Sequence, residues 1–154
     1  GSKKTIKVLM NKFDFCFKEK QGYVPILKEH VIKNNFSIKK NNNKIRIKSF
    51  ETQHGQTQST AYIIDKIAYL SDCSLVYKKD IKFLNNLNFL IIDCLQINSH
   101  PGHFNLESAL KLANTCKAKK TILTNLHVNL DYDKLKKILP PNIIPAFDGI
   151  NFSF

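Results

Sequence analysis

The sequence lacks several features that would assign a protein to a class at once. No apolar run in its 154 residues approaches the roughly 20 that a transmembrane helix needs, so we expect no membrane span. No secretory signal is visible, and Gly1-Ser2 is typical of the scar left by removal of a purification tag. The four cysteines include no C-x-x-C pair, which argues against a zinc knuckle and a disulfide framework. We therefore expect a cytoplasmic protein, with Cys94 and Cys116 in its core.

Acidic residues are scarce relative to basic ones. Twelve Asp and Glu against 24 Lys and Arg give a net charge of +12. Such a surplus either attracts a polyanion, such as nucleic acid or a phosphorylated substrate, or reflects a composition rich in Lys, Asn and Ile. The lysines are spread along the chain, and the sequence shows neither an RNP-type strand nor a helix-turn-helix signature. We therefore favour the compositional explanation and keep nucleic acid as a less favoured partner.

The hydrophobic pattern predicts one α/β domain over the whole chain, without a repeat or a low-complexity linker. Phe13, Phe15 and Phe17 alternate as in a strand, and residues 29–38 and 44–50 are expected to form a hairpin across an asparagine-rich turn. The later elements are strands 60–65 and 67–72, helix 78–86, strand 89–95, helix 105–116, strand 119–124 and helix 131–139. Strand–helix–strand order implies at least one right-handed parallel crossover, and hence a mixed sheet.

Polar side chains that can bind a metal recur at the ends of the predicted strands. Four of the five histidines and one aspartate occupy these positions: His54, Asp72, His100, His103 and His127. Each of them taken singly can be an ordinary loop or capping residue. Ligands of α/β sheets bind at such strand ends, and imidazole with carboxylate suits Zn, Mn or Fe. The repetition therefore indicates a metal site.

Four segments together resemble the metallo-β-lactamase-fold hydrolases, in particular the phosphoribosyl cyclic phosphodiesterase branch related to RNase Z. They are "HGQ" (54–56), "YLSDCS" (69–74), "HPGHFNLESAL" (100–110) and "LDYDKL" (130–135). Each is weak singly, but the combination is specific and the resemblance covers nearly the whole chain. It implies a metal-dependent hydrolase of phosphate esters. It also implies the C-terminal half of an αββα sandwich, a mixed sheet with helices on one face.

The resemblance assigns roles to individual residues. It implies that His54 is a metal ligand, that Asp72 bridges two metals, and that His103 lies near the reacting phosphate. Many members carry a histidine ligand where this chain has Asn125. We favour His127, two residues further on, as the replacement ligand.

Two residues remain alternatives in that assignment. Asn125 can instead supply an amide oxygen or a hydrogen bond to a ligand, and His100 is a further candidate for a supporting role.

One motif of the family is missing. The signature H-x-H-x-D-H, which supplies most ligands in the family, does not occur in this sequence. The resemblance therefore implies a truncated, C-terminal part of an enzyme that is inactive or weak without an N-terminal complement, unless the chain pairs with itself as a homo-oligomer. The alternatives are a non-catalytic remnant and a basic nucleic-acid-binding module.

Overall fold

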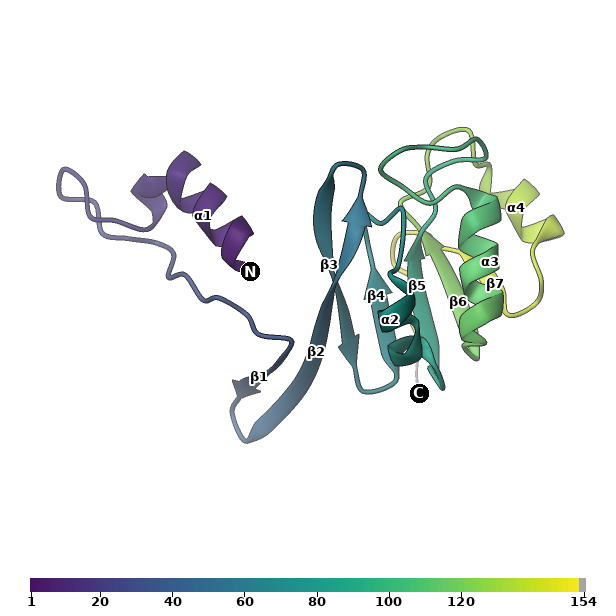
Figure 1. Ribbon diagram of the computed structural model, residues 1–154, viewed down its shortest axis with the longest axis horizontal. Helices are drawn as coiled ribbons and strands as arrows, with labels where there is room; N and C mark the ends of the chain where they lie inside the picture. Colours follow the sequence, from purple (N-terminus) through teal and green to yellow (C-terminus); the bar gives the residue numbers. More distant parts are fainter. Residues whose placement is uncertain (153–154) are drawn as a thin grey trace.

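Seven strands lie side by side in the order in which they occur along the chain (Figure 1). The computed structural model of the protein describes residues 1–152. The strands are β1 (Asn35–Lys40), β2 (Asn43–His54), β3 (Thr57–Ile64), β4 (Ile67–Leu70), β5 (Phe89–Asp93), β6 (Lys120–Thr124) and β7 (Ile143–Pro145). Strands β1 to β4 pair antiparallel, whereas β4 to β7 pair parallel. This confirms the predicted α/β class and the mixed sheet.

Three of the four α-helices in the described chain begin at a residue whose side chain caps them, and α2 is the exception. They are α1 (Lys3–Lys12), α2 (Lys78–Ile81), α3 (Leu106–Cys116) and α4 (Tyr132–Ile138), with 3-10 turns η1 (Asp14–Cys16) and η2 (Lys82–Leu84). Asn105 and Ser108 form a capping box at the start of α3, and Asp131 accepts a hydrogen bond from the backbone of Lys134 at the start of α4. No helix within residues 1–152 is long and apolar enough to cross a membrane.

The prediction of a strand over Phe13, Phe15 and Phe17 is wrong. Residues 3–12 form α1 and Asp14–Cys16 form the 3-10 turn η1, and the rings of Phe13 and Phe15 meet edge to face. An alternating pattern becomes a strand only where another strand can pair with it, and no strand of the described chain reaches this segment. Figure 1 shows α1 and the segment after it apart from the sheet. The first strand of the hairpin, predicted from residue 29, begins at Asn35 in the structure.

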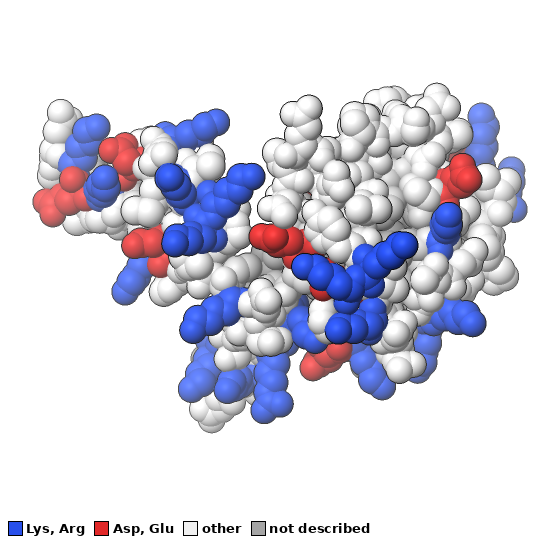
Figure 2. Space-filling view, in the orientation of Figure 1, with Lys and Arg blue, Asp and Glu red and all other residues white. Residues whose placement is uncertain are grey.

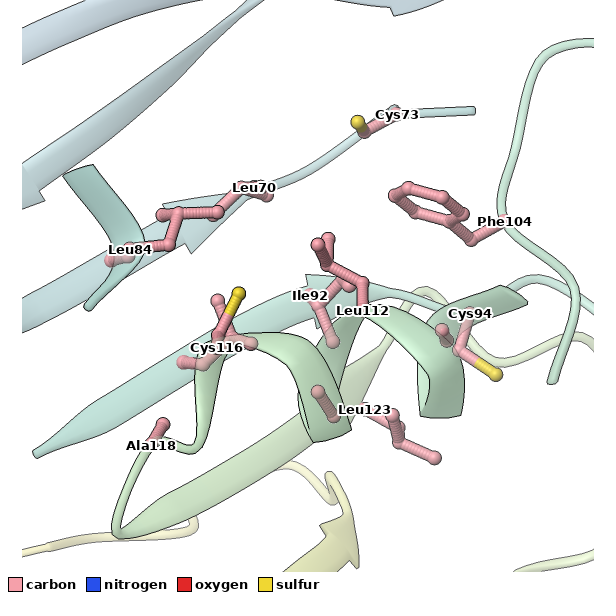
Figure 3. Packing of buried hydrophobic residues seen from close by; sticks show 14 of the residues in the cluster. Leu70, Cys73, Leu84, Ile92, Cys94, Phe104, Leu112, Cys116, Ala118 and Leu123 are labelled. Carbon is pink, nitrogen blue, oxygen red and sulfur yellow. The ribbon is translucent and has the colours of Figure 1, made fainter. Parts of the chain in front are cut away.

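The core lies between the sheet and the helices α2 and α3, which cover the same face (Figures 1 and 3). Its most deeply buried aliphatic side chains are Leu70, Leu84, Leu90, Ile92 and Leu123. Cys94 and Cys116 are buried in this core, which confirms their predicted place, and Cys73 joins them.

Burial determines the reactivity of these thiols. It raises the pKa of Cys73 and Cys116 to about 11 and that of Cys94 to about 12. Because the thiolate is the reactive form, we expect one fast equivalent of thiol at pH 8 in a reaction with Ellman's reagent, from the partly exposed Cys16. Denaturant should release the other three, and Cys16→Ser should abolish the fast phase. Fast labelling of Cys73 in the folded protein would contradict this arrangement.

Candidate metal centre

One edge of the sheet collects the polar residues that follow the strands. Strands β4, β5 and β6 are parallel, and β2 runs in the same direction because it is two antiparallel steps from β4. The side chains that this edge brings together are His54 at the end of β2, Asp72 after β4, Asp93 at the end of β5 and Asn125 after β6. The loop from β5 to α3 carries His103 to the same edge, since the backbone of Phe104 donates to the carbonyl of Cys73 at 2.7 Å.

His54, Asp72 and His103 form a group that can hold a metal ion. One donor atom from each lies within 4.8 Å of the others. The Nε2 atoms of His54 and His103 are 3.3 Å apart, and Nδ1 of His103 is 3.9 Å from Oδ1 of Asp72. Two nitrogens bound to one tetrahedral zinc at about 2.0–2.1 Å would lie about 3.3–3.4 Å from each other. This spacing suits two ligands of a common ion, and it is also that of a hydrogen bond between the two rings.

Asp93 is a buried carboxylate beneath this group. It is completely inaccessible, and it accepts hydrogen bonds from the backbone of Cys73 at 2.9 Å and from the side-chain amide of Asn125 at 3.0 Å. Its Oδ2 also lies 2.7 Å from Nδ1 of His103. A carboxylate that accepts from all these neighbours requires the proton on Nδ1, so the Nε2 lone pair of His103 is free to face His54.

Asp93 is a residue of the centre that was not predicted from the sequence. The residue ends a continuous apolar strand, where a single acid looks like the start of a loop. A usable signal was present, because the carboxyl ends of parallel strands meet at one edge and both neighbouring strands end in polar residues.

Asp72 and Asn125 both adopt a left-handed backbone conformation, with φ of 48° and 62°. Such angles are unfavourable for most residues other than glycine, and aspartate and asparagine tolerate them best. Asn125 directly follows β6 and Asp72 follows β4 after one residue, and the reversal of the backbone presents each side chain to the rim. The polar residues after β4 and β6 therefore stand where the chain turns sharply beside the centre.

Gly102 allows the loop between β5 and α3 to pass against His54. A Cβ atom at Gly102 would lie 3.0 Å from Cδ2 and 3.1 Å from Nε2 of His54. Any larger residue at position 102 would therefore displace the His54 ring or the loop that carries His103.

The remaining predicted residues lie beside or outside the group. The His100 ring is exposed, with its centroid 5.0 Å from that of His103, and its Nδ1 accepts a hydrogen bond from the backbone of Gly102. His127 is exposed, and its Nδ1 lies 3.4 Å from the backbone nitrogen of Asn129. The structure places Asn125, rather than His127, against Asp93 and His103. The ligand role of His127 stays a prediction.

The family follows from a comparison with known proteins. Residues 1–125 match the model of the beta-lactamase superfamily domain, so this chain belongs to that family. This match confirms the family of the resemblance noted in the sequence, and the solved structures confirm its metallo-β-lactamase fold.

The chain is also similar to individual known proteins. The crystal structure of a new diphosphatase from the PhnP family is 26% identical, with a TM-score of 0.84 over 97% of this chain and 55% of that one. The short form of human tRNase Z is 20% identical, with a TM-score of 0.57 over 78% of this chain and 47% of that one. An octanoyltransferase of Porphyromonas gingivalis is 27% identical over 109 residues, 69% of this chain and 22% of that protein. The chain thus spans about half the length of the solved relatives.

Proposed function

We propose that this chain carries the C-terminal part of the active site of a metal-dependent phosphodiesterase. The observation that supports this most directly is the convergence of His54, Asp72 and His103 from three separate segments, with donor atoms within 4.8 Å. Two imidazoles and one carboxylate suit Zn, Mn or Fe. The similarity to a PhnP-family diphosphatase supports a substrate that contains phosphate, and we propose a phosphate ester.

We propose a separate role for each residue around the metal site. A bound metal ion would polarise the phosphate and lower the pKa of bound water. His54 and Asp72 would hold it, and His103 would present Nε2 towards it because Asp93 fixes the proton on Nδ1. The family resemblance assigns His103 to the reacting phosphate, whereas the 3.3 Å distance to His54 supports a ligand role, which we propose here.

The sheet face opposite the helices supports a requirement for a complement. Ala61, Ile63, Ala68 and Leu70 point towards the helices, so their neighbours along the strands point the other way. Among these neighbours, Ile64 and Tyr69 are 38% and 45% exposed, and Ile38 pairs with Ile45 on the same exposed face of the hairpin. An apolar face of this kind marks an interaction surface. We propose that an N-terminal complementing polypeptide covers it and supplies further ligands, with a second copy of this chain as the alternative occupant.

The proposal is tested by hydrolysis of bis(p-nitrophenyl) phosphate with Zn or Mn present. The chain should show little or no hydrolysis by itself. It should gain activity when the N-terminal half of the PhnP-family diphosphatase is added in trans, and His54→Ala should abolish that gain. Metal binding without turnover, whichever N-terminal half is supplied, would contradict the proposal and favour a non-catalytic remnant.

A further inference from the structure

Lysines that are spread along the sequence gather on one surface of the folded chain. Lys44, Arg46 and Lys48 alternate along β2 and therefore share one face of the strand. The ammonium group of Lys48 lies 3.6 Å from the centre of the Phe83 ring, and that of Lys82 lies 5.3 Å from the same ring. Lys44, Arg46 and Lys48 line one hollow, which we call the cationic groove, and Lys82 lies beside it at the ring of Phe83. The four cations come from two separate segments. Figure 2 shows the basic side chains gathered over the β1–β2 hairpin and α2.

The groove is shallow and open, and it contains almost no internal countercharge. It has a volume of about 630 Å³, and the residues that line it include Phe83 but only one acidic residue, Asp65. Within residues 1–152, no Lys or Arg forms an ion pair with a carboxylate; both ion pairs found there involve His103. Only solvent and salt screen the repulsion among these cations. A polyanion that enters the groove is therefore attracted by them without displacing an existing carboxylate partner.

We propose that the cationic groove binds single-stranded nucleic acid through its phosphates. A positive groove with aromatic side chains in its wall is the usual surface for a single strand, since the cations follow the backbone and the rings accept bases or sugars. Lys44 to Lys48 cover about 13 Å of β2, at about 3.3 Å per residue, a row that suits successive phosphates. An anionic membrane is the alternative that the vesicle measurement below tests.

The groove is separate from the metal centre. Both lie along β2, but Lys48 precedes His54 by six residues, about 20 Å along an extended strand. Nucleic-acid binding can therefore be measured in EDTA. Absence of nucleic-acid binding would not argue against the proposed phosphodiesterase site, and absence of phosphodiesterase activity would not argue against the cationic groove.

The experiment is a fluorescence anisotropy titration of the full chain with a labelled oligouridine at two salt concentrations. Four phosphate contacts predict a loss of affinity of about 50-fold between 50 and 200 mM salt, from a slope of about −0.7 per contact for single strands. The triple variant Lys44→Gln, Arg46→Gln, Lys48→Gln should retain about one contact. Its affinity should be much weaker at 50 mM salt and fall only about 3-fold over the same range.

A matched control distinguishes binding at the cationic groove from non-specific attraction by the net charge of the protein. Lys134→Gln, Lys136→Gln, Lys137→Gln removes the same three charges from α4, away from the groove, and should leave most of the affinity and the salt slope intact. The double variant Lys44→Gln, Arg46→Gln avoids the contact of Lys48 with Phe83 and should still lose about half of the slope. Equal losses in groove and control variants would overturn the proposal. So would absence of oligouridine binding at 50 mM salt, or binding of phosphatidylserine vesicles in its place.

Discussion

Replacing His54 by alanine should lower the affinity of the protein for Zn or Mn by more than about 100-fold, because loss of a hydrogen-bonding partner of a ligand already costs about 10–100-fold. Asp72→Ala should lower it comparably, since Asp72 brings the one carboxylate of the group. His30→Ala should leave it unchanged, because His30 is exposed and lies outside the group. The measurement is equilibrium dialysis of EDTA-stripped protein against the metal, followed by elemental analysis. Equal metal content in all three variants would remove the site from consideration.

His103→Ala decides between the two roles of that residue. We expect metal affinity to fall as in His54→Ala, because Nε2 of His103 lies 3.3 Å from Nε2 of His54, the spacing of two ligands of one ion. Full metal binding combined with loss of complemented phosphodiesterase activity would contradict the ligand role and assign His103 to the reacting phosphate instead.

The pairing of the strands explains why part of this centre could be predicted from the sequence. Parallel strands end at a common edge, so His54 and Asp72 could be expected close together once each was placed at the end of a strand. The choice between Asn125 and His127 could not be made in this way. It depends on the turn after β6, where Asn125 takes a φ of 62° and turns its amide towards Asp93.

Other parts of the structure could not be predicted because they depend on contacts between segments that are distant in the sequence. Phe13, Phe15 and Phe17 alternate as a strand does, but no strand lies beside them in the described chain. The cationic groove could not be predicted from the sequence for a related reason. Lys48 and Lys82 are 34 positions apart in the sequence, and only the packing of η2 against β2 brings both to the ring of Phe83.

Replacing Asp93 by asparagine should weaken metal binding by about 10–100-fold although Asp93 is not in the ligand group. The carboxylate accepts hydrogen bonds on both oxygens, from Cys73, His103 and Asn125. An amide can accept on only one atom, and this oxygen would take the position of Oδ2, which faces both Cys73 and His103. A neutral oxygen holds the proton on Nδ1 of His103 less strongly than a carboxylate does. We therefore expect a fraction of His103 to carry its proton on Nε2 instead, where it cannot bind a metal.

The same substitution should also destabilise the fold by about 1–3 kcal/mol, because a buried donor loses its acceptor. Two measurements apply: urea unfolding for stability, and nitrogen-15 NMR of the imidazoles for the tautomer of His103. Asp80→Asn is the matched control, since Asp80 is also a buried aspartate but belongs to α2, outside the ligand group. It should leave the tautomer and the metal affinity unchanged. A wild-type tautomer and wild-type metal affinity in Asp93→Asn would show that Asp93 supports only the fold, and that the free Nε2 of His103 does not depend on its hydrogen bond to this carboxylate.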